Sequence, residues 1–208
     1  MAAEHGRRGL GTELTDTALR ALKAAGVTTA LLHATEMARP LYERMGFVPE
    51  GEFAELHGRP APRQSAPTTP GLRAGTGADL AAVLDLDRRA TGEDRGRLLR
   101  ALWPRGGLVH DHGGRVRGFL LRQGGSAVGA VIADPDAGLD LLAAALSASA
   151  AEAAGDFRVP LPVAQAGARG LLLRQGFREA FRTTRMHRGP SPAWDADRIF
   201  SAFNLYWG

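Results

Sequence analysis

The feature that most constrains the fold is a ten-residue segment that occurs twice. ARPLYERMGF at residues 38–47 returns as ARGLLLRQGF at residues 168–177, with six of the ten residues identical at a spacing of 130 positions. Both copies end in Gly-Phe, a pattern typical of a helix that stops at a left-handed glycine. The repeat therefore predicts two related units. The copies differ at one chemically important place, because Tyr42 of the first is replaced by Leu172 in the second.

The composition is that of a folded chain with no marked affinity for polyanions. Of its 208 residues 44% are apolar, enough to bury a core. The net charge of +4 comes from arginines scattered among 22 acidic residues, and Lys23 is the only lysine. This pattern favours the coding bias of a GC-rich genome over a polyanion-binding surface, so we expect no nucleic-acid partner. The absence of cysteine excludes disulfides, a thiolate nucleophile and a Cys-ligated metal.

The chain carries no pattern of membrane insertion or export. No stretch approaches 18 apolar residues, and the start, MAAEHGRRG, lacks the apolar region of a signal peptide. We therefore expect a soluble, cytoplasmic protein without a membrane partner.

The order of helical and strand patterns predicts an α/β fold built from an incomplete and a complete unit. GRPAPRQSAPTTPG, residues 58–71, holds four prolines and reads as a linker. Before it, the patterns predict helix, strand, helix and strand at about 14–25, 27–33, 38–45 and 47–56. After it we expect a strand at 72–74, helices at 78–89 and 93–103, three strands, a helix at 139–153, a strand near 159, a helix at 168–175 and a strand through Met186. The last four elements repeat the order of the first segment. We expect a mixed central sheet flanked by helices in each unit.

A glycine-rich loop precedes the first helix. In RRGLGTEL, Gly9 and Gly11 allow a tight turn in which several N–H groups point outward. A loop of this kind at a helix N-terminus favours anions, because the free donors and the helix dipole both attract phosphate oxygens. Taken alone, the pattern also fits an ordinary turn.

Together, RRGLGT, the helix, the strand VTTALLH and the segment ARPLYERMGF resemble the GNAT superfamily of N-acetyltransferases. The pyrophosphate loop of that family, Q/R-x-x-G-x-G/A, matches at Gly9 and Gly11, and its tyrosine four residues before Gly-Phe matches Tyr42. Two positions depart from the pattern: Gly6 occupies the Q/R slot, and Thr35 stands where asparagine is common. The resemblance implies a cofactor-binding set of Arg7, Arg8, Gly9, Leu10, Gly11, Thr12, Thr35 and Ala38.

The resemblance also implies a chemistry. In the family, an acetyl group passes directly from acetyl-CoA to an amine, and the tyrosine protonates the departing thiolate, so no protein nucleophile is required. We expect no metal. A phenol of pKa near 10 suits that role in Tyr42. The alternative is that Tyr42 only packs its ring. We expect the acceptor to be a small-molecule or peptide amine.

The second unit resembles the degenerate GNAT-like domain that follows an active one in certain bacterial acetyltransferases. Gly138-Leu139-Asp140 stands at the position of Gly9-Leu10-Gly11, and an aspartate there opposes a pyrophosphate by its charge. Leu172 cannot donate a proton. We therefore expect the second unit to keep the fold without binding CoA. The predicted organisation is half of a GNAT domain at 1–57, the linker at 58–71, a degenerate GNAT-like domain at 72–189 and an aromatic tail at 190–208.

A whole GNAT domain has several strands and helices before its phosphate loop, whereas only a few residues precede the loop here. Because those elements form the acceptor pocket and order the pantetheine arm, we expect weak CoA binding and little transfer by this chain. The same observation leaves a second hypothesis open, a non-catalytic GNAT-like module for binding or assembly. An incomplete first unit has an exposed sheet edge. We expect this edge to be covered by the second unit or by a second copy in a homodimer.

Two other patterns concern a metal site and a partner surface. His110 and His112 share one face of a strand with no third ligand nearby, which favours a hairpin rim over a metal site. The aromatic tail could form a partner surface, but the pattern favours a tail that folds back over its own sheet. Its aromatic residues are Trp194, Phe200, Phe203, Tyr206 and Trp207.

Overall fold

The computed structural model describes residues 9–60, 69–122, 129–152 and 156–203. Its helices are α1 (Leu10–Ala24), α2 (Arg39–Arg44), α3 (Leu80–Thr91), α4 (Gly96–Leu102), α5 (Pro135–Glu152) and α6 (Ala166–Arg174). Its strands are β1 (Ala30–Ala34), β2 (Val48–Gly58), β3 (Leu72–Ala74), β4 (Gly107–His112), β5 (Arg115–Leu121), β6 (Ala130–Ala133), β7 (Phe157–Pro162), β8 (Arg178–Arg188) and β9 (Ile199–Ser201). Within the described residues no helix is long and apolar enough to cross a membrane.

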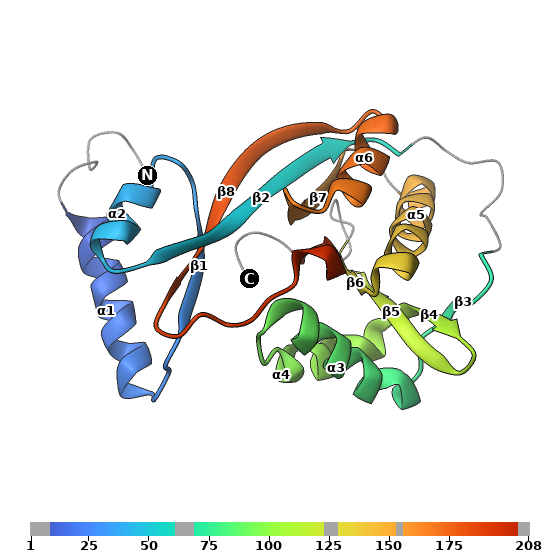
Figure 1. The fold of residues 1–208 in the computed structure, drawn as a ribbon, viewed down its shortest axis with the longest axis horizontal. Helices are drawn as coiled ribbons and strands as arrows, with labels where there is room; N and C mark the ends of the chain where they lie inside the picture. Colours follow the sequence, from blue (N-terminus) through green and yellow to red (C-terminus); the bar gives the residue numbers. More distant parts are fainter. Residues whose placement is uncertain (1–8, 61–68, 123–128, 153–155, 204–208) are drawn as a thin grey trace.

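The strands form two curved sheets with helices around them (Figure 1). One sheet has the order β1-β8-β2-β7 and the other the order β3-β4-β5-β6-β9, and all strand pairs in the described residues are antiparallel. Helices α1 and α2 flank the end of the long strands that is drawn at the left, and α5 and α6 lie at the opposite end. The predicted α/β class is therefore confirmed.

The repeated decapeptide forms the same helix end twice, as predicted. In α2, Gly46 has φ 82°, its N–H donates to the Glu43 carbonyl at 3.0 Å, and Phe47 N–H donates to Tyr42 at 3.0 Å. In α6, Gly176 has φ 83°, and its N–H and that of Phe177 donate to Leu173 at 3.0 Å and Leu172 at 3.1 Å. These are the two hydrogen bonds of a Schellman motif, for which glycine is favoured because of its positive φ.

The two repeats do not have separate central sheets, which corrects one of our expectations. Strand β8 of the second repeat lies between β1 and β2 of the first, and β2 in turn lies between β8 and β7. Each repeat therefore gives its last strand to the other. The exchange pairs both edges of two long strands and so removes the exposed edges that each repeat would have alone. The predicted packing of the first repeat on the second is confirmed by this shared sheet.

The apolar core has three parts. One lies between α5, α6, β6 and β7, and a second lies between α3, α4 and the five-stranded sheet. The third and smallest is centred on Ala34, Phe47 and Met186, and α1 and α2 cover it. Phe200 and Phe203 are buried, so this part of the aromatic tail folds back as predicted. Tyr206 and Trp207 lie outside the described residues.

A second expectation was wrong at the start of α5. We expected Gly138-Leu139-Asp140 to match the position of the phosphate loop and a helix to begin at about residue 139, but α5 already begins at Pro135 and contains these residues. Proline is favoured in the first turn of a helix, where its missing N–H costs nothing. The second repeat therefore has no glycine loop at this position. Asp140 instead lies 3.6 Å from His110 in β4.

Candidate functional site

The N-terminus of α1 presents free backbone donors. Gly9 is the N-cap residue with φ 74°, no side chain caps the helix, and the first intrahelical bond runs from Glu13 N–H to the Gly9 carbonyl at 3.0 Å. The N–H groups of Leu10, Gly11 and Thr12 precede that bond, so the helix geometry leaves them for an external acceptor. No atom lies within 4 Å of the place where a Cβ on Gly9 would be. A phosphate could therefore approach this backbone closely.

The described structure covers part of the predicted loop. Arg7 and Arg8 lie outside the described residues. Leu10 and Thr12 are exposed, and Gly11 is half-buried. A Cβ on Gly11 would lie 3.7 Å from Leu41 in α2, so this position joins the predicted loop to the helix that carries Tyr42.

Tyr42 lies half-buried on α2, over the smallest core. Its ring meets that of Phe47 edge to face, with centroids 5.7 Å apart and an interplanar angle of 72°. It also packs against the cluster of Ala34, Phe47 and Met186, the last of which comes from β8. Within the described residues its hydroxyl makes no hydrogen bond. The equivalent Leu172 is fully buried in the core of the second repeat. The first repeat thus keeps a phenol that is partly open, where the second has only a packing residue.

Thr35 and Ala38 form the turn that leads into α2. The Thr35 side-chain oxygen is 3.3 Å from the Ala38 N–H, and its carbonyl accepts from Ala38 and Arg39 at 3.0 and 2.9 Å. Thr35 therefore has a structural role in the turn that precedes α2, whose N-cap residue is Ala38. A role at a cofactor stays a prediction for both residues.

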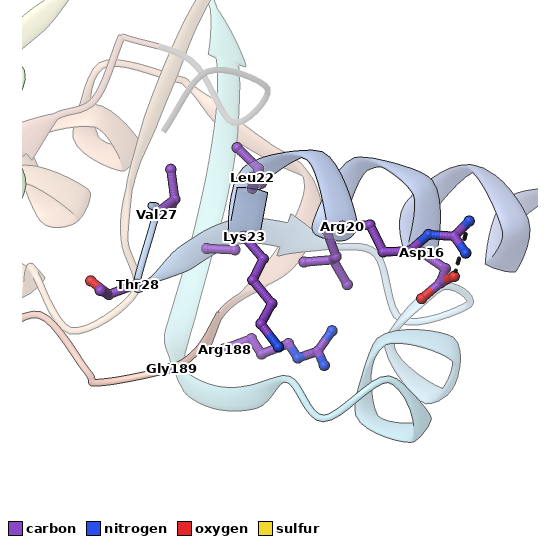
Figure 2. Close-up of a pocket in the computed structure, with 10 residues that line it drawn as sticks. Asp16, Arg20, Leu22, Lys23, Val27, Thr28, Arg188 and Gly189 are labelled. Atoms are coloured by element: carbon purple, nitrogen blue, oxygen red, sulfur yellow. Dashed lines mark ion pairs between the residues drawn. The ribbon is translucent and has the colours of Figure 1, made fainter. Parts of the chain in front are cut away.

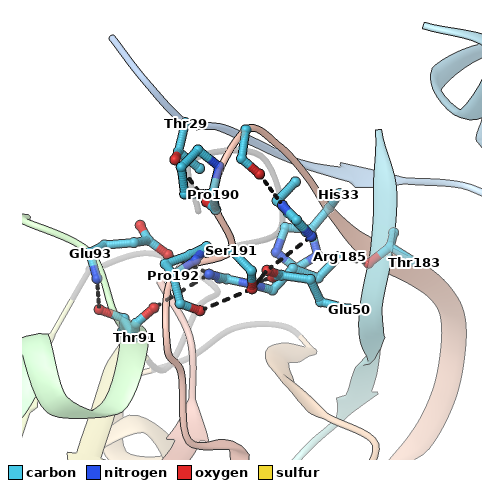
Figure 3. Close-up of polar contacts among 12 residues, drawn as sticks. Thr29, His33, Glu50, Thr91, Glu93, Thr183, Arg185, Pro190, Ser191 and Pro192 are labelled. Atoms are coloured by element: carbon cyan, nitrogen blue, oxygen red, sulfur yellow. Dashed lines mark hydrogen bonds and ion pairs between the residues drawn. The ribbon is translucent and has the colours of Figure 1, made fainter. Parts of the chain in front are cut away.

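A buried ion network lies where the two repeats meet (Figure 3). Sequence patterns gave no sign of it. Arg185 of β8 is 4% exposed and donates to Glu50 of β2 at 2.8 Å and to Glu93 at 2.9 Å. Its guanidinium also lies 5.2 Å from the ring centroid of Trp194. The partners are far apart in sequence, so no local spacing could have revealed them. The network joins β2, β8 and the segment after α3.

His33 of β1 lies beside this network. Its Nδ1 is 3.2 Å from the Thr183 hydroxyl, and its ring meets Phe53 edge to face at 4.7 Å. Burial, together with the positive charge of Arg185, lowers the pKa of His33 to about 4. The imidazole is therefore neutral at physiological pH.

A groove of about 450 Å³ runs along the C-terminal half of α1 (Figure 2). Its lining includes Leu19 and Lys23 of α1, Val27 and Arg188 at the end of β8. In Figure 2, Lys23 and Arg188 extend toward each other from the two walls. The groove begins near Asp16 and not at the free donors of Leu10–Thr12, so it is separate from the predicted phosphate loop. Among the described residues no group of three or more His, Asp or Glu side chains could hold a metal ion.

Two family models match this chain. The family described as "Acetyltransferase (GNAT) domain" matches residues 83–201, and a second family with the same description matches residues 1–60. The first match covers more than half of the chain. The chain therefore belongs to the GNAT acetyltransferase family, and both of its repeats are recognised as GNAT domains.

Solved structures show the same fold. A Pyrococcus horikoshii protein classed provisionally as an acetyltransferase superposes with a TM-score of 0.77 at 23% identity, over 99% of this chain and 68% of that one. A GCN5-related N-acetyltransferase from Sphaerobacter thermophilus gives 0.61 at 18% identity, over 94% and 72%. A tandem GNAT protein from the clavulanic acid biosynthesis pathway gives 0.57 at 16% identity, over 92% and 73%. No curated protein matches the chain.

Proposed function

We propose that this protein is an acetyl-CoA-dependent N-acetyltransferase whose reaction takes place at the first repeat. The observation that carries the proposal is the open N-terminus of α1 beside α2. There, Leu10–Thr12 present free N–H groups. Gly11 lies next to Leu41 of α2, the residue that precedes Tyr42. Membership of the GNAT family supports this assignment.

The residues at this end of α1 suit a pyrophosphate. Backbone N–H groups of Gly9–Thr12 would donate to its oxygens, and the positive φ and open surroundings of Gly9 let the phosphates come close. The positive end of the helix dipole adds to the attraction. Arg7 and Arg8 would supply further charge.

Tyr42 would serve as general acid. Acetyl-CoA supplies the activated acyl group as a thioester. The acceptor nitrogen forms a bond to the acyl carbon as the carbon–sulfur bond breaks, and Tyr42 donates its hydroxyl proton to the leaving sulfur. The proton that the amine loses passes to solvent, which also returns a proton to Tyr42. The half-buried ring, held by Phe47, keeps the hydroxyl on one side of α2. The acceptor is an amine on a small molecule or a peptide.

An NMR titration tests the proposal even for weak binding. Free CoA should shift the amide signals of Gly9–Thr12, and the shifts should saturate. Shifts at other sites, or none, would contradict the proposal. Dephospho-CoA, which keeps the pyrophosphate, should give the same pattern at these four amides.

A non-catalytic binding or assembly module is the second candidate, and one observation favours it. None of the residues of α1 is buried, and Leu14 on this helix is 69% exposed. An apolar face of this kind is typical of a surface that binds another protein segment. The titration separates the candidates, because a module of this kind needs no response to CoA at Gly9–Thr12.

A further inference from the structure

In the second repeat the consecutive strands β6 and β7 lie in different sheets, and the space between these two strands is called the crevice below. Strand β6 belongs to one sheet and β7 to the other, and α5 connects them along the chain. In open α/β sheets ligands bind in a crevice beside strand ends, and the N-terminus of a helix attracts anions. The space between β6 and β7 has a comparable position, because α5 begins two residues after β6 ends. This crevice is therefore the place where the second repeat would hold an extended ligand.

The C-terminal segment of the same chain fills that crevice. In Figure 1 the chain after β8 turns back to the middle of the molecule, where β9 lies beside β6. Ser201 and Ile199 pair with Val131 and Ile132 of β6. On the other side, Ala202 N–H donates to the Pro160 carbonyl of β7 at 2.7 Å. Residues 199–202 thus bond to both walls with their backbone, as an extended ligand would.

The side chains of this segment are part of the core. Ile199, Phe200, Ser201 and Phe203 are all at most 5% exposed. The Phe200 ring lies against α5 so closely that a Cβ on Gly138 would be 2.0 Å from it. Gly138 therefore makes room for this ring. A segment that is buried to this extent is a fixed element of the fold, whereas a mobile lid would have exposed side chains.

The charged side chains beside the crevice are also paired with other residues of the same chain. Asp134, the last residue before α5, forms ion pairs with Arg198 of the C-terminal segment and with Arg117 of β5. Gln165 donates to the Asp197 carbonyl at 2.7 Å. An incoming phosphate would meet Asp134 and Asp136 here, and the nearest cations are already paired with them.

We infer that residues 199–203 are a permanent internal occupant of the ligand crevice of the second repeat. They close it to any pantetheine thioester and connect its two sheets. The second repeat is thereby confined to a structural role. The inference does not require the first repeat to be active, so it and the proposed function can fail separately.

Hydrogen exchange on the intact chain, with and without CoA, gives the first test. Peptides that cover residues 199–203 should exchange as slowly as those of β6, and CoA should not accelerate them. Faster exchange in this segment on addition of CoA would show a displaceable lid and overturn the inference. Exchange as fast as that of a surface loop would also overturn it.

A pair of substitutions gives a second test. Ala in place of Gly usually stabilises a helix, but Gly138→Ala must push against Phe200. We expect it to lower Tm by about 3–10 °C, as overpacking of a core does in a chain of this size. In a Phe200→Ala background the same change should lower Tm by less than half as much. Equal losses in the two backgrounds would overturn the inference.

Gly170→Ala in α6 is the matched control. Its added Cβ would meet only the end of the flexible Arg174 side chain, at 3.3 Å. This variant should keep or raise Tm, and it should leave exchange in residues 199–203 unchanged. A loss as large as that of Gly138→Ala would point to a general intolerance of helix substitutions and against the specific contact.

Discussion

Phe53 of β2 lies directly opposite Thr183 of β8 in the antiparallel ladder, and the two positions are equivalent in the 130-residue repeat. A position that pairs with its own equivalent marks the centre of a two-fold relationship. The repeats therefore meet as the subunits of a symmetric dimer do, although they belong to one chain. The geometry around Tyr42 depends on this arrangement, because Met186 reaches it from the second repeat.

Met186→Ala tests this dependence. The side chain is fully buried under α1 and α2, so its truncation should cost about 2–5 kcal/mol of unfolding free energy. Amide exchange in α2 should rise although the substitution lies in the other repeat. Urea unfolding and hydrogen exchange measure the two effects. Met37→Ala is the control, because Met37 is 91% exposed and its truncation should change stability by less than about 0.5 kcal/mol.

The Arg185 network should be costly to break from one side. Arg185→Met leaves Glu50 and Glu93 without their buried cation, and loss of one partner of a buried ion pair costs about 3–5 kcal/mol. Arg182→Met, which removes a surface pair with Glu179 and Glu52, should have a much smaller effect. Urea titrations measure the free energy of unfolding of both variants. Equal losses would show that the buried network stabilises the fold no more than the surface pair does.

His33 should make stability depend on pH above the range of carboxylates. Its pKa in the folded protein is about 4, below the ordinary 6.5, so between these values the unfolded chain binds the proton more readily. The free energy of unfolding should therefore fall by about 3 kcal/mol as the pH drops from 6.5 to 4. His33→Asn should remove most of this slope. The aspartates and the glutamate whose pKa values are lowered in the folded protein are the same in both proteins, so their contribution cancels in the comparison.

The charge at position 11 should decide CoA binding. Gly11→Asp places a carboxylate among the free donors of α1 and should weaken CoA binding by about 10- to 100-fold or more. Gly11→Asn has the same size without the charge, and the structure leaves room for either side chain, since the nearest atom to an added Cβ is 3.7 Å away. NMR titration of both variants measures the difference. Equal affinities would place the pyrophosphate elsewhere.

Tyr42→Phe should separate binding from chemistry. With an amine that the protein acetylates, loss of the hydroxyl should lower kcat by about 100- to 10,000-fold and leave CoA affinity nearly unchanged. The only other tyrosine of the chain, Tyr206, provides a control, and Tyr206→Phe should retain full turnover. A thiol-release assay measures both. Full turnover of Tyr42→Phe would remove the general acid from the proposed mechanism.

Local patterns predicted local structure well in this protein. The repeated helix end, the order of the elements and the folded-back tail all follow from short-range spacing, because a Gly-Phe stop or an apolar stretch acts over a few residues. The predicted start of α5, at about residue 139, was too late, because the helix begins at Pro135 and includes Gly138, which makes room for Phe200.

The exchange of β2 and β8 could not be predicted in the same way. Strand alternation shows which faces of a strand are buried but not which distant edge it pairs with. The contacts of Arg185 depend on that pairing, and so does the position of Met186 under Tyr42. The residues proposed to bind CoA were found from a motif, and their role stays a prediction.

The exchanged strands have a consequence for how the molecule can be divided. A break between β2 and β3 leaves one fragment with β1 and β2 and another with β8, yet β8 still belongs between those two strands. Neither fragment can complete the four-stranded sheet by itself. The backbone pairing of β8 with β1 and β2 then holds the sheet together more than the covalent connection does. The two pieces have the geometry of a split protein, whose halves regain their structure only by complementation.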